Sequence, residues 1–514
     1  MLVKTFGSAV YGVEAITITV EVNVNNQGQH YYIVGLPDNA VKESLQRVES
    51  AIKSNHHYMP RTKLVVNLAP ADIKKTGSAF DLPIAIGTLG ATEQISNPER
   101  LSAYVIMGEL SLDGAIKPIK GALPIALQAK KDGFEGLIVP AANAREAAMV
   151  SNLKVYGVQH LNEVINFFKN ELSLEPTHIN IQEEFAHAQS DFEIDFCDVK
   201  GQENIKRALE IAAAGGHNAI LIGPPGAGKT MLAKRLPTIL PPLTLQEALE
   251  TTKIHSVAGK LPENATLVSK RPFRSPHHTI SDVALVGGGG NPQPGEISLA
   301  HNGVLFLDEL PEFKRAVLEV MRQPMEERKV TISRARIALD FPASFMLIAS
   351  MNPCPCGYFN HPEKECTCGP GIVQKYLSRI SGPLLDRIDL HVEVTPVDFN
   401  ELSSNQTYEK SDAIRSRVIL ARNIQAERYK ENEGVYANAQ MSSKILKEIC
   451  IVSSAGHQLL KTAMEKLNLS ARAYDRILKV SRTIADLSGE TAIKSEHIAE
   501  AIQYRSLDRE GWGG

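Results

Sequence analysis

The stretch AILIGPPGAGKT, residues 219–230, is a short apolar run that leads directly into a loop rich in glycine and proline. Its last eight residues match the pattern G-x-x-x-x-G-K-[ST], and the helix-like run MLAKRL follows them. Glycines have no Cβ, so successive backbone N–H groups in such a loop can converge on phosphate oxygens at a helix N-terminus. The order strand, loop, helix therefore predicts an α/β nucleotide-binding core. The predicted phosphate-binding residues are Gly223, Pro224, Pro225, Gly226, Ala227, Gly228, Lys229 and Thr230.

A second apolar run delivers acidic residues to the same predicted site. Lys229 supplies a positive charge for the β- and γ-phosphates, and the Thr230 hydroxyl is a ligand for Mg²⁺. Downstream, VLFL at residues 304–307 is followed directly by Asp308 and Glu309, as in a Walker B strand. Asp308 is predicted to hold the Mg²⁺ shell, and Glu309 to orient and activate the attacking water. The sequence thus predicts ATP hydrolysis with Mg²⁺ as cofactor.

Three further polar residues complete the predicted catalytic set. The run FMLIAS, residues 345–350, leads to Met351 and then Asn352, a segment that resembles sensor 1 of the AAA+ ATPases. SGPLLDRIDL, residues 381–390, is similar to the segment that presents an arginine finger in trans, and Arg387 is the candidate. A surface ion pair of Arg387 with a neighbouring aspartate is the alternative.

A helix that begins near Ser470, its predicted N-cap, resembles the sensor 2 region. Arg472 is preferred there over Arg476, and the choice between them stays open, since either is equally compatible with a solvated helix face.

The composition bounds the class of protein. The 514 residues include 55 basic and 58 acidic side chains, which give a formal charge of −3. That balance argues against binding of nucleic acid by overall charge, although a groove or pore needs only a few well-placed cations. Neither a secretory leader nor a run of about 18 apolar residues is visible. We therefore expect a cytoplasmic protein without membrane contact.

The chain divides into four parts by pattern. Residues 1–168 alternate strand-like and helix-like runs and indicate an α+β domain. Residues 169–195 are polar and acidic and are interpreted as a linker. Residues 196–398 hold the nucleotide-binding core, and residues 399–514 contain five helix-like runs that predict a helical lid.

The four cysteines Cys354, Cys356, Cys366 and Cys368 fall within fifteen residues, in the spacing C-x-C-x₉-C-x-C. Four thiolates suit a tetrahedral structural Zn²⁺ site. An iron–sulfur cluster and unliganded thiols are the alternatives. Because Cys354 follows Asn352 by two residues, a metal here would stiffen the loop that senses nucleotide.

Two segments of the core are candidates for moving parts. Residues 276–296, which include His277, His278 and four consecutive glycines at 287–290, lengthen the span between the two nucleotide motifs. The alternation KVTISRARIALDF, residues 329–341, predicts a β-hairpin that carries Arg334 and Arg336 at its tip. Such arginines would contact DNA phosphates without regard to base sequence. A passive surface loop and an ordinary solvated hairpin are the respective alternatives.

Taken together, GPPGAGKT, the insertion FRSPHHTISDVALVGGGGNPQPGEISLAHNGVLFLDEL, SMNPCPCGY and LSRISGPLLDRIDLHVEV resemble the magnesium-chelatase-like AAA+ proteins, specifically the YifB/ComM family. The resemblance covers nearly the whole chain. It implies a Lon-protease-like N-terminal domain of the ribosomal S5 domain 2 type, an AAA+ core and a helical lid. It also implies a homohexameric, ATP-dependent DNA helicase that promotes branch migration during the integration of transforming DNA.

The resemblance leaves two other functions to weigh. The core is also similar to the motor subunit of magnesium chelatase, although that subunit does not carry the Lon-like domain. TGSAFD, residues 76–81, resembles the nucleophile turn of Lon, with Ser78 as the serine. The position of the catalytic lysine falls on Leu123, which cannot act as a base, and Lys117 and Lys120 are out of register. A domain that kept this fold without proteolysis is therefore the favoured interpretation.

Overall fold

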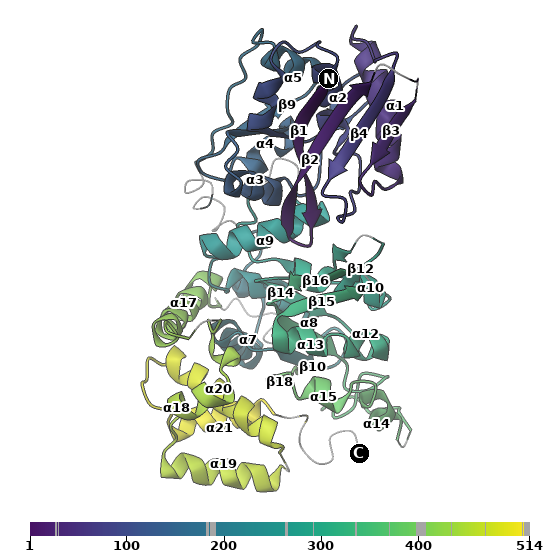
Figure 1. The fold of residues 1–514 in the computed structure, drawn as a ribbon. Helices are drawn as coiled ribbons and strands as arrows, with labels where there is room; N and C mark the ends of the chain where they lie inside the picture. Colours follow the sequence, from purple (N-terminus) through teal and green to yellow (C-terminus); the bar gives the residue numbers. More distant parts are fainter. Residues whose placement is uncertain are drawn as a thin grey trace.

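The computed structural model describes residues 1–25, 28, 30–180, 185, 192–262, 266–290, 292–334, 337–369, 371–396, 408–432, 434–467, 469–505 and 507. The molecule is elongated, with an N-terminal α+β domain at one end, an α/β domain in the middle and a helical domain at the other end (Figure 1). Among the described helices, none combines the length and hydrophobicity that crossing a lipid bilayer requires.

The N-terminal domain is built on a seven-stranded sheet in the order β3-β4-β2-β1-β5-β8-β9. Its strands are β1 (Leu2–Tyr11), β2 (Glu14–Asn25), β3 (Tyr31–Val34), β4 (Lys63–Ala69), β5 (Tyr104–Ile106), β8 (Gly136–Pro140) and β9 (Lys154–Val158). Alternation of apolar residues on β2 buries Ile18, Val20 and Val22 on one face. One prediction fails here: AYVIMGEL is two strands, because the chain turns at Gly108 and Glu109–Leu110 (β6) pairs instead with Ile116–Lys117 (β7).

Helices cover both faces of this sheet (Figure 1). One face packs against α1 (Asn39–Ser54), α2 (Asp81–Ala91) and α5 (Leu161–Phe168), and the other against α3 (Ala122–Lys131) and α4 (Ala141–Ala147). The expected helices α1, α3 and α4 are all present. The α2 helix was not expected, since all eleven of its residues are buried and it shows no polar face.

The central domain contains the predicted nucleotide-binding core, as a five-stranded sheet in the order β11-β14-β17-β10-β18. The strands are β10 (Ala219–Ile222), β11 (Phe273–Arg274), β14 (Val304–Leu307), β17 (Met346–Met351) and β18 (Leu390–Glu393). All neighbouring strands are parallel. Every residue of β10, β14 and β17 is buried, as expected for a parallel sheet covered on both faces. The three predicted motif strands therefore end at the same edge of one sheet.

Most of the helices around this sheet are short, and several lie in the segment between β10 and β14. They are α7 (Glu203–Gly215), α8 (Lys229–Arg235), α9 (Leu245–Ala258), α10 (Asp282–Val286), α11 (Glu296–Leu299), α12 (Arg315–Glu319), α13 (Arg322–Glu327), α14 (Ile372–Leu377) and α15 (Gly382–Leu385). Residues 276–296 contain α10 and a small hairpin of β12 (Gly287–Gly288) and β13 (Gln293–Pro294). A Cβ at Gly287 would lie 2.5 Å from the Gln293 carbonyl oxygen, so this turn needs glycine.

The predicted basic hairpin is present. β15 (Lys329–Arg334) pairs antiparallel with β16 (Ile337–Pro342), and Arg334 lies opposite Ile337. The two residues between the strands, which include Arg336, lie outside the described residues, as does the side chain of Arg334.

The described part of the C-terminal domain contains the five predicted α-helices. They are α17 (Ser411–Arg428), α18 (Ser443–Ile449), α19 (Ser454–Lys466), α20 (Ala471–Leu487) and α21 (Ser495–Gln503). The Ser470 hydroxyl accepts the Ala473 N–H at 3.2 Å, which confirms the predicted N-cap. The α17 and α20 helices pack against α7, so the helical domain shares its hydrophobic core with the back of the central sheet.

The N-terminal domain contacts the central domain mainly through α9 (Figure 1). Glu146 on α4 is buried there and accepts hydrogen bonds from the Ser256 hydroxyl on α9 and from the Leu123 N–H. Burial raises the pKa of Glu146, against the opposing effect of these hydrogen bonds. The tip of the β1–β2 hairpin also reaches the central domain, where Tyr11 packs against its core.

Candidate active site

The P-loop surrounds the ammonium group of Lys229. Its Nζ donates to the carbonyl oxygens of Gly223 and Pro224, at 2.7 and 2.9 Å, and to Asn352 Oδ1 at 3.1 Å. Burial lowers the pKa of Lys229, while the charges of the nearby acidic pair oppose that shift. The first residue of the loop packs closely against the backbone after β18, because a Cβ at Gly223 would lie 2.4 Å from the Val394 carbonyl oxygen. The predicted Lys229 and Asn352 are thus in direct contact.

The acidic pair lies opposite the loop, at the end of β14. Asp308 Oδ2 accepts the Thr230 hydroxyl at 2.7 Å, and Asp308 Oδ1 accepts the Glu309 N–H at 3.1 Å and the Ser350 hydroxyl. The contact between Thr230 and Asp308 fits the oxygen donor set of Mg²⁺, which is bound through carboxylate, hydroxyl and phosphate oxygens. Ser350 was not expected at the site; it comes from inside β17, where only burial was predicted.

Glu309 points away from this contact. Its backbone has a φ of +54°, in the left-handed region, and its side chain is 57% exposed. His278 Nδ1 lies 3.6 Å from Glu309 Oε2, and the His277 and His278 rings lie 4.1 Å apart between centroids. Residues 276–296 therefore bring a histidine to the carboxylate that is predicted to activate water. Sequence alone gave no sign of this contact.

A cavity of about 400 Å³ opens beside the P-loop. Its floor is formed by the loop and the start of α8, and one wall by residues 198–202, which lead into α7. The cysteine-containing segment between β17 and α14 contributes further lining residues. This volume lies within the usual range for small-molecule sites.

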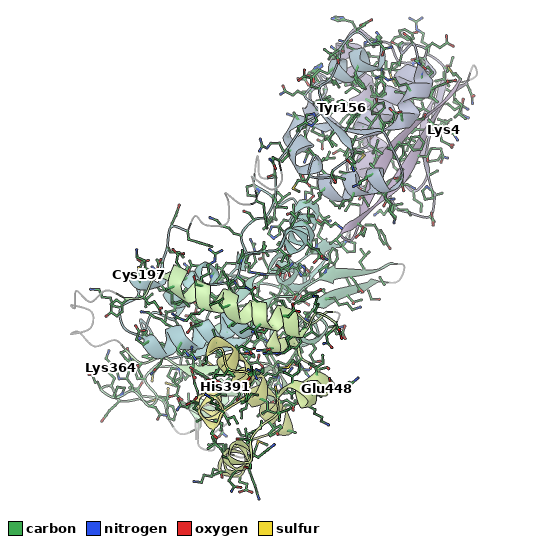
Figure 2. All side chains as sticks on the ribbon, turned by 90° about the vertical axis from the view of Figure 1, so that its left-hand side faces the viewer. Lys4, Tyr156, Cys197, Lys364, His391 and Glu448 are labelled. Atoms are coloured by element: carbon green, nitrogen blue, oxygen red, sulfur yellow. The ribbon has the colours of Figure 1, made fainter. Side chains whose placement is uncertain are left out.

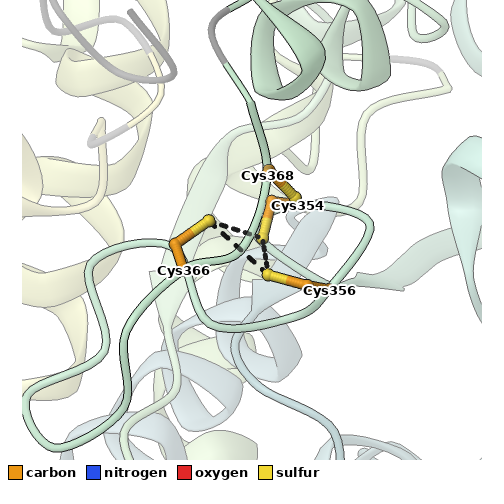
Figure 3. Close-up of side chains that lie close together, drawn as sticks. All are labelled: Cys354, Cys356, Cys366 and Cys368. Carbon is orange, nitrogen blue, oxygen red and sulfur yellow. Dashed lines mark hydrogen bonds between the residues drawn. The ribbon is translucent and has the colours of Figure 1, made fainter.

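The four cysteines converge, as Figure 3 shows. Their sulfur atoms all lie within 4.8 Å of one another, and the sulfurs of Cys354, Cys356 and Cys366 are 3.2, 3.5 and 3.7 Å apart in pairs. Tetrahedral Zn²⁺ with Zn–S bonds near 2.3 Å would separate its sulfurs by about 3.8 Å. The four thiols therefore fit a zinc ion and would hold it as a closed structural site.

Arg387 lies at the opposite edge of the sheet from the P-loop. It precedes β18, and the Asn218 side chain, just before β10, donates to its carbonyl oxygen at 3.0 Å. The P-loop leaves the far end of β10, about 13 Å away along a four-residue strand. Arg387 is buried and paired with Glu326, not with an adjacent aspartate as the alternative interpretation supposed.

The two lid arginines have different partners. Arg472 is 63% exposed and lies 3.3 Å from Asp386. Arg476 is 23% exposed and lies 2.8 Å from the fully buried Asp389. Asp389 also bonds His217, a buried residue with a pKa lowered by burial. Although burial alone would raise the pKa of Asp389, Arg476 and His217 hold it well below its usual range.

These arginines line one polar cleft. It has a volume of about 180 Å³ and lies between α20 and the segment before β18, with Arg387, Arg472 and Arg476 on its walls. It shares no lining residue with the cavity at the P-loop. The candidate finger and sensor 2 residues are thus gathered on one face of the described chain, away from its own phosphate loop.

Among the described residues, the hydrogen-bond partner of the serine in the Lon-like turn is a carboxylate and not a lysine. The Ser78 hydroxyl donates to the Glu109 carboxylate, and Leu123 is fully buried. Lys75, the lysine nearest in sequence, is buried and donates to the Pro70 carbonyl. This arrangement gives Ser78 no amine base.

Comparison with known proteins gives matches over three parts of the chain. Family models match as "Magnesium chelatase, subunit ChlI" at residues 195–402, "Subunit ChlI of Mg-chelatase" at 20–143 and "Magnesium chelatase, subunit ChlI C-terminal" at 408–505.

Three relatives show how far the similarity extends. Competence protein ComM of Haemophilus influenzae is 43% identical over 510 residues, which cover 99% of this chain and 98% of that protein. The protein YifB of Escherichia coli is 43% identical over 509 residues, 98% of this chain and 96% of its own length. Lon protease 2 of Bacillus subtilis is 33% identical over 154 residues, only 27% of this chain and 26% of that protein. The first two relatives match from end to end, and the third matches in part.

Proposed function

The chain belongs to the YifB/ComM family of magnesium-chelatase-like AAA+ ATPases, and from that membership we propose that it is an ATP-driven motor that moves along branched DNA. The observation that carries the ATPase part is the meeting of Lys229, Thr230 and Asp308 at one edge of the parallel sheet. The DNA part draws on the end-to-end similarity to a competence protein. We propose integration of transforming DNA by branch migration, in the cytoplasm, as its role.

In the proposed hydrolysis, each residue has a distinct task. Bound Mg²⁺ would neutralise charge on the β- and γ-phosphates. Thr230 and Asp308, which are in contact, would supply oxygen ligands to it, and Ser350 fixes the Asp308 carboxylate by a hydrogen bond. Lys229 binds the phosphates. Glu309 accepts a proton from the attacking water, which Asn352 helps to align.

We propose that six copies form a ring in which each active site is shared between neighbours. Arg387 and Arg472 lie on one cleft, at the edge of the sheet opposite the P-loop. An arginine in that position cannot reach the nucleotide of its own chain, but it can reach one held by an adjacent copy. Arg387 would first have to leave Glu326, whereas Arg472 is already exposed.

Contact with DNA is assigned to the β15–β16 hairpin. The first strand of this hairpin ends at Arg334, and Arg336 follows it two positions later in the sequence. With a net charge of −3, the chain offers no general attraction for DNA, so local cations must supply it. We propose that this hairpin follows the phosphate backbone without base specificity. The cysteine cluster is proposed to bind structural Zn²⁺.

Two other functions remain as outcomes of the test. A chelatase-type motor would need a partner subunit and a porphyrin client, and its ATP turnover would ignore DNA. A protease would need a base at Ser78, and the partner found there is the Glu109 carboxylate. Neither alternative is favoured by a specific observation at the active site.

The experiment that tests the proposal is steady-state ATP hydrolysis with and without single-stranded and branched DNA. We expect DNA to stimulate ATP turnover by the wild type. Glu309→Gln should abolish ATP turnover with and without DNA. The double variant Arg334→Ala/Arg336→Ala should keep the turnover measured without DNA and lose only the stimulation by DNA. Arg61→Ala/Lys63→Ala, two basic residues at β4 of the N-terminal domain, provides the matched charge control. A rate of ATP hydrolysis that does not change when either DNA is added would contradict the DNA-motor role and leave the ATPase assignment intact.

A further inference from the structure

The cysteine segment forms part of the nucleotide cavity as well as a cluster of thiols. Tyr358, His361 and Lys364, all between Cys356 and Cys366, line the cavity together with residues in the range 198–202. Cys197, which directly precedes that range, and Lys364 lie on the same side of the central domain in Figure 2. The loop held by the thiols therefore closes one side of the space in which a nucleotide on the P-loop must lie.

A tight backbone contact fixes this wall to the P-loop. A Cβ placed on Gly357 would lie 2.5 Å from Pro225 Cδ, and Gly357 has a φ of +86°. Both observations require glycine at this point. Gly357 N–H also donates to the Cys354 carbonyl at 3.0 Å. The turn from Cys354 to Gly357, which contains the first two cysteines, thus contacts the phosphate loop directly, so the position of the turn and the position of the loop depend on each other.

The side chains of the wall form an aromatic pair with a cation over one face of the Tyr358 ring, which leaves the other face for a ligand. The Tyr358 and His361 rings meet edge-on, with centroids 5.6 Å apart, and Lys364 Nζ lies 4.9 Å from the centre of the Tyr358 ring. His361 Nδ1 accepts the N–H groups of Glu363 and Lys364, at 3.0 and 3.1 Å. A neutral imidazole bonded in this way carries its proton on Nε2, which makes Nε2 a hydrogen-bond donor.

We propose that this wall binds the base of the nucleotide: Tyr358 stacks on the purine ring, and the metal-organised cysteine loop holds Tyr358 in place through the Gly357–Pro225 contact. The phosphates occupy the P-loop, so the base and ribose extend into the remainder of the cavity, between residues 198–202 and the aromatic wall. Aromatic side chains stack on any base through its π-face. Loss of metal from the four cysteines therefore weakens binding of the base and leaves phosphate binding intact.

This inference rests on the proposed ATPase function, so the test separates the two. Binding of ADP and of inorganic tripolyphosphate is measured by titration calorimetry on the full-length protein, and bound zinc is measured by mass spectrometry. The variants are Tyr358→Ala, Tyr358→Phe and Cys366→Ser/Cys368→Ser. Tyr436→Ala, a tyrosine 69% exposed outside the cavity, is the matched control, and Lys229→Ala tests the P-loop.

We expect Tyr358→Ala to weaken ADP binding about tenfold, a typical loss for one base–aromatic stack. Tripolyphosphate binding stays unchanged, and Tyr358→Phe and Tyr436→Ala bind ADP as the wild type does. The cysteine variant loses zinc and reproduces the Tyr358→Ala pattern. Should Tyr358→Ala fold poorly by circular dichroism, Tyr358→Leu takes its place.

Three results would overturn the inference. ADP affinity unchanged in Tyr358→Ala, while Lys229→Ala abolishes it, refutes the base contact and leaves the proposed ATPase intact. Equal weakening of ADP and tripolyphosphate by Tyr358→Ala refutes stacking, because the whole site is then disturbed. ADP binding that survives Lys229→Ala contradicts the proposed phosphate site itself.

Discussion

The two lid arginines, Arg472 and Arg476, are expected to respond differently to truncation because their acidic partners differ in burial. Asp389 is 1% exposed, and its Oδ1, which makes no hydrogen bond to the described residues, lies 2.8 Å from Arg476. Arg476→Ala leaves this carboxylate charged and buried. Removal of one member of a buried pair typically costs about 3–5 kcal/mol. Because Arg476 is 23% exposed and His217 remains bonded to Asp389, we expect about 2–3 kcal/mol here.

Arg472→Ala is expected to have little effect on stability. Arg472 is 63% exposed and its partner Asp386 is 33% exposed, so the pair is screened by solvent and contributes about 0–1 kcal/mol. As the proposed sensor 2 residue, Arg472 should instead affect catalysis. We expect Arg472→Ala to lower ATP turnover at least about tenfold, since it removes a charge that acts on the transferred phosphoryl group.

The assay is urea unfolding of both variants, followed by circular dichroism, beside steady-state ATPase activity. Arg476→Lys should recover most of the lost stability by restoring the charge. The double variant Asp389→Asn/Arg476→Ala should be more stable than the sum of the two single losses predicts, because it leaves no buried charge. Equal stabilities for Arg472→Ala and Arg476→Ala, or full turnover in Arg472→Ala, would refute the assignment.

Three further predictions follow from the site and the domain contact. A mixture of Arg472→Ala subunits, with lowered turnover, and Glu309→Gln subunits, with none, should show more ATPase activity than the two variants assayed separately. Some interfaces in the mixture pair an intact Glu309 with an intact Arg472 of the adjacent copy. No gain in activity in verified mixed assemblies would contradict shared sites. Ser350→Ala removes a hydrogen bond to the Asp308 carboxylate, and such a bond contributes about 1.5–3 kcal/mol. The Mg²⁺ concentration that gives half-maximal turnover should therefore rise about tenfold in Ser350→Ala and stay unchanged in the control variant Ser344→Ala. An unchanged Mg²⁺ dependence in Ser350→Ala would contradict a role for Ser350 at the site. The raised pKa of Glu146 means that the native state binds the Glu146 proton more strongly than the unfolded state does, so the protein loses stability as the pH rises from the unfolded pKa near 4.5 to the native pKa. The free energy of unfolding, measured from pH 4.5 to 8, should show this loss in the wild type and not in Glu146→Gln. Parallel pH profiles for the two proteins would show that Glu146 does not titrate in this way.

Local pattern was sufficient for much of the fold. The apolar runs before Gly223, Asp308 and Asn352 are buried parallel strands, and the five C-terminal helices follow their amphipathic sequences. The alternation around Lys329 also predicted the hairpin. In each case the residues that decide the structure are neighbours in sequence, so the period of apolar residues is visible directly.

Elements without such a period were missed. The α2 helix, Asp81–Ala91, is buried on every side, so it has no polar face from which a helical period could be recognised. AYVIMGEL was expected to be a single strand because its apolar residues are continuous, yet Gly108 turns the chain. There a Cβ would lie 2.9 Å from Ile116 Cγ2, a contact with a residue that the local pattern does not reveal.

The chemical motifs of the site were predictable, whereas the contacts between them were not. Lys229 and Asn352 are 123 residues apart and touch only because β10 and β17 are adjacent strands. Ser350 was expected only to be buried, and the contact of His278 with Glu309 depends on the path of an insertion. Tyr358 lines the cavity beside the P-loop, but the sequence analysis considered its segment only for the cysteines. Each of these placements depends on tertiary structure and not on local sequence.

The most direct test of the proposed DNA motor is the release of a fluorescently labelled strand from a branched DNA substrate, recorded while ATP hydrolysis is measured in the same sample. We predict ATP-dependent release by the wild type, none with Glu309→Gln, and hydrolysis without release for Arg334→Ala/Arg336→Ala. Hydrolysis by the wild type at full rate with no strand released from any branched or forked substrate would contradict the account and redirect the search to another client.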